Sequence, residues 1–292
     1  MALNYDMLLA SPPAIKHQQY GDRDTILYAL GVGLGVEHQD ERQLPFLWER
    51  DLLALPTSAA TLAWTRFADL DLGITYAKMV HAEQRMVVHQ PVPPVGAVYS
   101  QLRVQDVVDR GVDRGAMIYW ERKLFNQQDD SLISTQILSI LARGDGGFGG
   151  PDRPSLRSHE IPERGPDMKC EMQVSTRSAL IYRLTGDINP LHIDPAYARK
   201  VGFPGPILHG LATYGFVGHA ILRSVLDYDA SRLVELDGRF SAPVYPGDRI
   251  EIDLWVDGDI VSLRATAPDR NLVIFDNGRA RILPKDENRS AS

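Results

Sequence analysis

The sequence predicts an α+β protein made of two tandem units, each with a long central helix and an antiparallel sheet. Three observations predict this class. A glycine-rich segment and a polar run divide the chain near its middle. On each side of this division, an apolar helical segment is followed by several strand-like segments. The two halves also align, with one shift that pairs Tyr28 with Tyr182, Arg23 with Arg177, Leu30 with Leu184 and His38 with His192.

The first half begins with a helix that we expect Asp22 or Asp24 to cap and that runs through Leu30. Residues 56–64 are the expected counterpart of the apolar helix. Strands follow, because apolar and β-branched residues alternate between turn-forming residues. We place these strands at residues 82–89, 99–108, 117–126 and 132–142.

The second half repeats this order. A helix is expected near residues 178–184, and Asp194 caps a short helix with Pro195 at its first position. The next segment, 207–222, contains no charged residue but is shorter than the roughly 20 residues that cross a bilayer, so we expect a buried core helix. The strands that follow are placed at residues 233–241, 249–256, 261–267 and 272–283.

A long apolar helix followed by antiparallel strands is the order expected when a sheet wraps around a helix, which is the hot dog fold. We therefore expect a double hot dog with one unit over residues 1–150, a linker over 151–166 and a second unit over 167–292. The glycines of Gly144–Gly149 formally match a dinucleotide-binding fingerprint. The segment Pro151–Pro154 that follows cannot open the helix that such a site requires, so we interpret the glycine-rich segment as part of the connection.

Composition narrows the class of protein. The 292 residues are 44% hydrophobic and 24% charged, as in globular proteins that bury a core. The net charge of -7 argues against nucleic acid as a partner. The single cysteine, Cys170, excludes an internal disulfide and a multi-cysteine metal site, and we expect no metal. With no secretory leader, membrane span or peroxisomal address in the sequence, we expect a cytoplasmic location.

The segment Tyr182–His192 carries the strongest chemical signal. It places Asp187, Asn189 and His192 on a turn that Gly186 and Pro190 build. Aspartate and histidine exchange protons readily near neutral pH. In the repeat alignment, two glycines, Gly33 and Gly35, stand opposite Asp187 and Asn189. The first half therefore lacks these groups, and we expect one site per chain.

This segment resembles the signature of the hydratase 2, or MaoC-like dehydratase, family, and Met79–Gln84 resembles the N-terminal half of its eukaryotic peroxisomal members. The resemblance implies a double hot dog whose N-terminal unit is non-catalytic and binds the acyl chain. It implies a hydro-lyase that adds water reversibly and syn to trans-2-enoyl-CoA, giving (3R)-hydroxyacyl-CoA. Coenzyme A would be part of this acyl-CoA thioester substrate, with no separate cofactor. We also expect a homodimer.

Hydration of an enoyl thioester needs a base for water, an acid for C2 and donors for the thioester oxygen. Asp187 and His192 can hold one water between them, in either assignment of base and acid, and Asn189 can orient the carboxylate or the water. The segment Pro206–Leu211 opens the apolar helix, whose first N–H groups have no internal partners. The family uses the glycine of a His-Gly pair as oxyanion donor, which here is Gly210.

Several further residues are candidates for the substrate site, each with a plainer alternative. His209 is either a site residue or a satisfied core histidine, and His219 is expected to serve helix packing. His81 is a candidate for the acyl tunnel or an ordinary sheet residue; alternation places it on one strand face with Glu83 and His89, and Gln84 on the other. Arg199 and Lys200 are candidates for the CoA phosphates or simply solvated cations.

Other functions remain open from the sequence. A hot dog acyl-CoA thioesterase would attack the thioester carbonyl with an activated water. A hydratase or dehydratase of the same chemistry could act on steroid, branched-dicarboxylic or carrier-protein thioesters. A non-catalytic acyl-CoA binding protein is a third alternative.

Overall fold

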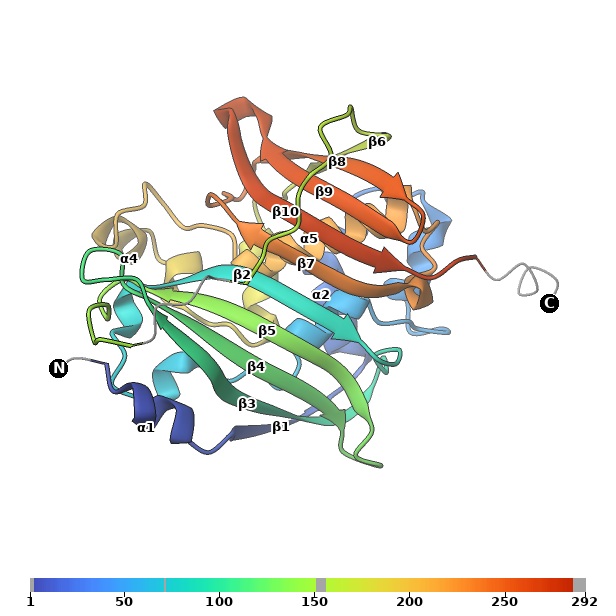
Figure 1. The fold of residues 1–292 in the computed structure, drawn as a ribbon. Coiled ribbons are helices and arrows are strands. Elements are labelled where there is room, and N and C mark those ends of the chain that lie inside the picture. Colours follow the sequence, from blue (N-terminus) through green and yellow to red (C-terminus); the bar gives the residue numbers. More distant parts are fainter. Residues whose placement is uncertain (1–2, 71, 151–155, 286–292) are drawn as a thin grey trace.

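The structure, a computed structural model, describes residues 3–70, 72–150 and 156–285 (Figure 1). Its described residues form one ten-stranded antiparallel sheet in the order β1-β3-β4-β5-β2-β7-β10-β9-β8-β6. The strands are β1 (Ala14–Tyr20), β2 (Met79–Val88), β3 (Gly96–Asp109), β4 (Ala116–Asn126), β5 (Leu132–Ala142), β6 (Met168–Gln173), β7 (Leu233–Phe240), β8 (Arg249–Asp257), β9 (Ile260–Ala267) and β10 (Leu272–Ile282).

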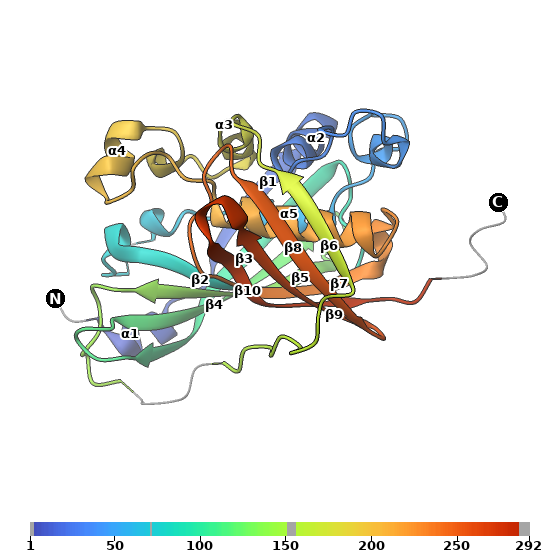
Figure 2. The same ribbon diagram turned by 90° about the horizontal axis from the view of Figure 1, so that it is seen from above.

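The helices lie mainly on one face of this sheet, which we call the inner face (Figure 2). The α-helices are α1 (Tyr5–Ala10), α2 (Asp22–Gly31), α3 (Ser178–Tyr182), α4 (Pro195–Lys200) and α5 (Gly210–Ser224). The 3-10 helices are η1 (Glu41–Phe46), η2 (Pro56–Ala60), η3 (Phe67–Asp69), η4 (Tyr76–Lys78), η5 (Arg183–Thr185), η6 (Pro190–His192), η7 (Ala230–Arg232) and η8 (Pro268–Arg270). In Figure 2, α5 lies between the sheet and the layer that contains α2, α3 and α4.

The eight strands expected from the sequence are confirmed to within three residues at each end. Two strands, β1 and β6, were not predicted. Both are edge strands, because each pairs with only one neighbour in the sheet. An edge strand buries less of its surface than a central one, so β1, with sequence AIKHQQY, shows little of the apolar signal that identifies the others.

The apolar helix of the second half is confirmed as α5, with every residue from 211 to 222 buried. It begins at Gly210 rather than Ile207, because the preceding residues are extended and Leu208 donates its N–H to Val244 O at 2.7 Å. A Cβ at Gly215 would lie 2.4 Å from Val32, and one at Gly218 would lie 2.6 Å from Thr57. These glycines therefore let neighbouring chain segments approach the helix closely.

We predicted an apolar helix over residues 56–64 as the first-half counterpart of α5, and this prediction is wrong. Residues 56–60 form only the short helix η2, and the chain then turns, with Ala63 at φ 51°. The Ser58 hydroxyl donates to Leu55 O and the Thr61 hydroxyl to Ser58 O, and such side-chain bonds compete with helical ones. Within the described residues, a long central helix is found in the second unit alone.

The main apolar core belongs to both halves. Residues of α2 and the segment 54–63 pack with α5 and the strands of the second half in one cluster. The repeat-related residues Tyr28 and Tyr182 meet where α2 contacts α3, with ring centroids 5.8 Å apart. At the start of α2, Asp24 accepts the Gly21 N–H at 2.9 Å, so the capping position is Gly21 and not Asp22 or Asp24. The unit boundaries remain a prediction, and residues 151–155 of the expected linker lie outside the described residues.

A bulge in β2 changes which of its side chains share a face. His81 pairs with Ile140, but Glu83 pairs with Ser139, so one residue is inserted between them. This places His81 on the inner face with Gln84, while Glu83 and His89 lie on the outer face. The predicted grouping of His81 with Glu83 and His89 is therefore wrong.

The pairing of β2 with β7, which we call the seam, joins the strands of the two halves. Residues 157–160 cross its outer face, where Asn277 Nδ2 donates to His159 O at 2.8 Å. Within the described part of the chain, no helix is both long enough and apolar enough to cross a membrane.

Candidate active site

The turn after α3 is fixed by its own backbone and side chains. Gly186 has φ 131°, a conformation that other residues rarely adopt. Asp187 Oδ1 accepts the Asn189 N–H at 3.2 Å, and Asn189 Oδ1 accepts the Leu191 N–H at 3.0 Å. Pro190 then starts η6. Asn189 and Pro190 are exposed, so their contact with the site is through the turn that they stabilise.

His192 ends η6 and is buried. Its Nδ1 lies 2.9 Å from Ile207 O, and because a carbonyl only accepts, Nδ1 carries the proton in this bond. Burial lowers the pKa of His192, although Ile207 O and the Asp187 carboxylate favour the charged form. The ring is therefore neutral near pH 7 and offers Nε2 as a hydrogen-bond acceptor.

His209 packs against His192, with ring centroids 3.6 Å apart and planes 24° apart. Its Nε2 donates to the main-chain oxygen of Asp187 at 3.1 Å. Burial, together with His192, holds the pKa of His209 well below its ordinary value. His209 is thus neither an isolated core residue nor solvated: it connects the turn of Asp187 to the start of α5.

Asp187, His192 and His209 each offer one atom that could bind a metal ion. These three atoms lie within 4.8 Å of one another. Among the described residues, these three form the group that could hold a metal ion. Each histidine uses one ring nitrogen for a main-chain carbonyl, which leaves the other ring nitrogen for further contacts. The absence of a metal stays a prediction, and so does proton transfer by these side chains.

Gly210 is the first residue of α5, directly after His209. Its N–H has no backbone acceptor among the described residues, as expected in the first turn of a helix. A Cβ at Gly210 would make only ordinary contact with Phe240, at 3.8 Å. The N–H thus directly follows His209, whose ring stacks on His192, and no backbone acceptor among the described residues occupies it.

His81 lies next to this region, with its ring centroid 5.1 Å from that of Phe240. Its Nε2 donates to Glu83 O at 3.0 Å. Burial lowers the pKa of His81 to about 4, so the ring is neutral. This placement agrees with a residue that lines the substrate path, a role that stays a prediction.

Arg199 and Lys200 lie apart from the cluster, exposed at the C-terminal end of α4. Neither side chain makes a hydrogen bond or ion pair with the described residues. Their binding of CoA phosphates stays a prediction. His219 is buried, with its ring nitrogens bonded to Val32 O and the Tyr228 hydroxyl, so it serves helix packing as expected.

Sequence reasoning did not identify three neighbours of the site. The ring of Tyr182 lies 4.9 Å from that of His209, and its hydroxyl is buried with no hydrogen-bond partner among the described residues. Phe240 faces Gly210, and Trp64 lies beside Gly186. The alignment of Tyr28 with Tyr182 was the one available signal. The contacts of Phe240 and Trp64 depend on chain segments distant in sequence.

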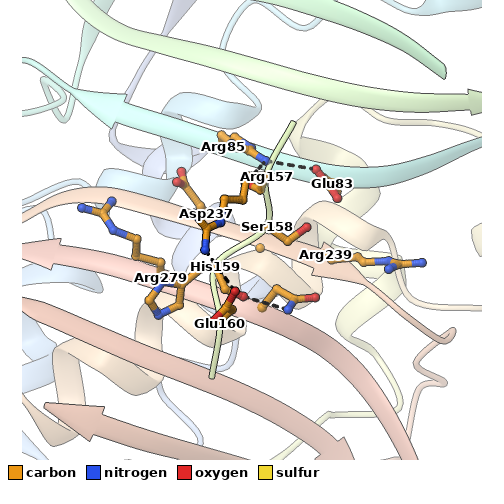
Figure 3. Close-up of a pocket in the computed structure, with 11 residues that line it drawn as sticks. Glu83, Arg85, Arg157, Ser158, His159, Glu160, Asp237, Arg239 and Arg279 are labelled. Atoms are coloured by element: carbon orange, nitrogen blue, oxygen red, sulfur yellow. Dashed lines mark hydrogen bonds and ion pairs between the residues drawn. The ribbon is translucent and has the colours of Figure 1, made fainter. Parts of the chain in front are cut away.

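A groove of about 450 Å³ lies on the outer face at the seam (Figure 3). Charged residues of both signs line it, including Arg85, Arg239, Arg279 and Asp237. None of the predicted site residues is among those that line it. We therefore treat it as separate from the site on the inner face.

Two family models match the chain and together cover most of it. Residues 18–144 match the MFE-2 hydratase 2 N-terminal domain, and residues 157–269 match the MaoC like domain. An enoyl-CoA hydratase of Mycobacterium tuberculosis is 37% identical over 286 residues, which is 95% of this chain and 98% of that protein. The chain belongs to the MaoC-like dehydratase family and carries the hydratase 2 N-terminal domain.

Solved structures agree with this assignment. A MaoC-like dehydratase from Phytophthora capsici superposes with a TM-score of 0.86 and is 29% identical, covering 97% of this chain and 100% of that one. A further M. tuberculosis protein, described as a double hotdog fold, gives a TM-score of 0.60 at 16% identity over 96% of this chain and 98% of its own. The double hot dog class is thereby confirmed.

Proposed function

We propose that the protein is a (3R)-specific 2-enoyl-CoA hydratase, a hydro-lyase that adds water to trans-2-enoyl-CoA and catalyses the reverse dehydration. One observation carries this proposal: Asp187 and His192 lie within 4.8 Å of each other through their polar atoms, beside the free Gly210 N–H. The family relationship supports it, since the matched models describe hydratase 2 and MaoC like domains.

The geometry suits the activation of one water. His192 Nε2 and the Asp187 carboxylate are both acceptors, so a single water can donate one hydrogen to each. Its oxygen then forms a bond to C3, and the pair of side chains takes one proton from the water and returns one to C2. The Gly210 N–H holds the thioester oxygen while enolate charge develops. Because one water is held at one place, hydroxyl and proton reach the same face of the double bond.

We propose that the N-terminal unit binds the acyl chain. Gly33 and Gly35 stand where Asp187 and Asn189 would be needed, so this unit lacks the proton-transfer groups. Among the described residues, the apolar inner face of its sheet is covered by the short helix η3 and adjoining loops, which include Phe67 and Leu70, and not by a long helix. Loops yield to a ligand more easily than a packed helix does.

Chiral analysis of the product tests the proposal. The substrates to compare are crotonyl-CoA, decenoyl-CoA and a branched or cyclic enoyl-CoA. We expect the product to be predominantly the (3R) alcohol. In deuterated water, we expect deuterium to be added at C2 on the same face as the hydroxyl. A predominantly (3S) product would contradict the proposal. Release of free thiol from a saturated acyl-CoA would instead favour a thioesterase.

The homodimer, the cytoplasmic location and the preferred acyl group stay predictions. The same panel of substrates, extended to carrier-protein thioesters, establishes the last of these.

A further inference from the structure

A buried arginine in the N-terminal unit has no acidic partner. Arg122, on β4, is 1% exposed, and no carboxylate among the described residues forms an ion pair with it. Its guanidinium donates to two main-chain oxygens, Ala59 O at 2.9 Å and Leu62 O. Burial lowers the pKa of Arg122 to about 9. Buried charge without an opposite charge is unfavourable, so its retention needs a reason.

Three more side chains hold the same stretch of backbone, which we call the clamped segment (residues 59–64). Gln136 Nε2 donates to Ala59 O at 3.0 Å, and the Ser100 hydroxyl donates to Ala63 O at 2.7 Å. Gln18 Oε1 accepts the Ala63 N–H. The four side chains come from β1, β3, β4 and β5, so four of the five strands of the first half hold this segment.

The clamped segment has an unfavourable backbone conformation. Ala63 has φ 51°, in the left-handed region that residues with a Cβ rarely adopt. Such a conformation persists only where surrounding contacts determine it. Here the hydrogen bonds to both peptide groups of Ala63 supply that constraint.

The clamped segment lies against the catalytic turn. A Cβ built on Gly186 would be 3.7 Å from Trp64 Cβ and 4.0 Å from Thr61 O. Gly186 directly precedes Asp187. Thr61 and Trp64 of the clamped segment are thus neighbours of the backbone that leads into Asp187, whose main-chain oxygen accepts a hydrogen bond from His209.

Burial decides between two roles for these polar groups. Arg122 and Gln136 are each 1% exposed, and both donate to main-chain oxygens of the clamped segment. Residues that line a pocket for a polar acyl group would have more accessible surface. The polar groups hold protein backbone and do not line a cavity.

We propose that Arg122 is a positioning residue for hydration: it fixes the clamped segment against Gly186 and so sets the position of Asp187 relative to His192. This inference rests on the proposed function. It means that the N-terminal unit contributes to the chemical step as well as to acyl binding.

The test compares Arg122→Met, Arg122→Lys and Ser100→Ala with wild type in the full chain, using crotonyl-CoA and decenoyl-CoA. Small displacements of catalytic groups cost ~10–100-fold in rate. We expect Arg122→Met to lower kcat by about that factor, equally for both chain lengths, with KM little changed. Arg122→Lys should recover part of kcat, because its ammonium can still reach a carbonyl. Ser100→Ala is the milder variant if Arg122→Met does not fold.

Val108→Ala is the matched control, because Val108 is buried in the same unit in a separate apolar cluster with Met117 and Tyr119, which includes no residue of the clamped segment. It should lose stability but keep kcat. The proposal is overturned if both Arg122→Met and Ser100→Ala keep wild-type kcat, or if KM alone rises and only for the longer chain. Hydration by the wild-type protein is measured first. An inactive wild-type protein would contradict the proposed function. The variants test the role of Arg122 once the wild-type protein has been shown to be active.

Discussion

At the scale of single residues, the close stacking of His192 on His209 constrains their charge. Two protonated rings with centroids 3.6 Å apart would repel each other strongly, and burial already lowers the pKa of both. Both rings are therefore neutral at working pH. Neutral rings have one donor and one acceptor nitrogen each, and main-chain carbonyls fix which nitrogen donates.

Asp187→Asn and His192→Gln should each lower kcat by ~10²–10⁴-fold, the usual range for loss of a positioned acid or base. Substrate binding should change much less. The double variant should be far from additive, because both side chains act on the same water. Steady-state kinetics of hydration measure all three variants.

Asp194→Asn is the control for these changes. Asp194 caps α4 by accepting the N–H groups of Ala196 and Tyr197, and asparagine caps a helix equally well. This variant should keep wild-type turnover. A folded Asp187→Asn or His192→Gln protein with near wild-type kcat would show that the site is assigned wrongly.

At the scale of elements, the start of α5 determines what Gly210 can do. The helix begins three residues later than the sequence suggested, which makes Gly210 its first residue and leaves its N–H free. Had the helix begun at Ile207, the Gly210 N–H would have lain near the end of the first turn. The extended residues 207–209 thus place the donor next to His192 and His209.

Gly210→Pro should lower kcat by ~10²–10³-fold, because it removes one oxyanion donor. Proline is well tolerated at the first position of a helix, and His209, at φ −60° and ψ 141°, already has the conformation that precedes proline. Thermal unfolding should therefore be little changed. Gly210→Ala keeps the N–H and serves as the comparison; equal losses in the two variants would mean that the N–H is not the reason.

At the scale of the whole molecule, the two halves share a sheet and a core but not the chemistry. The first half contributes α2 and the segment 54–63, which pack with α5 and the strands of the second half. His38, the repeat counterpart of His192, is instead exposed in a turn. The two halves therefore share a sheet and a core, but His38 is not placed as His192 is.

One site per chain should be seen by titration with a tight product analogue. His38→Ala should keep wild-type kcat, since Gly33 and Gly35 replace the partners that His38 would need. His192→Ala, made in parallel, should be nearly inactive. Two sites per chain, or a His38→Ala variant as inactive as His192→Ala, would overturn this division.

The seam should respond to pH through Asp237 on β7. Burial raises the pKa of Asp237 to about 6 from 3.8, although Arg85 and Arg279 oppose this. An acid with a raised folded-state pKa contributes stability below its unfolded pKa and loses it as pH rises through the folded value. The asparagine of the Asp237→Asn variant cannot ionise. We therefore expect the free energy of unfolding of this variant to be about 1–3 kcal/mol higher than that of wild type at pH 7.5.

At pH 4 the two proteins should have nearly equal free energies of unfolding, measured by urea denaturation. Glu160→Gln is the control in the same groove; its carboxylate pairs with Arg157 at 3.2 Å, and both side chains are mostly exposed. It should show no such pH-dependent difference. A less stable Asp237→Asn protein at pH 7.5 would mean that attraction to the arginines outweighs burial.

The sequence by itself determined the features that depend on local pattern. Alternation within eight strands, the uncharged run that became α5 and the turn chemistry of Gly186, Asn189 and Pro190 all follow from neighbours along the chain. The same holds for the signature that carries Asp187 and His192. Short-range periodicity and turn preferences are encoded locally, so they can be read before the chain is folded.

Only the tertiary structure decided the rest. The edge strand β1, the bulge that turns His81 inward and the shortness of η2 depend on partners far away in sequence. His209 stacks on His192, which lies 17 positions away in the sequence. Arg122 donates to the main-chain oxygen of Ala59, which lies 63 positions away. Such contacts form when packing brings distant segments together. The sequence therefore predicted which residues carry the chemistry, and the fold determined how they are held.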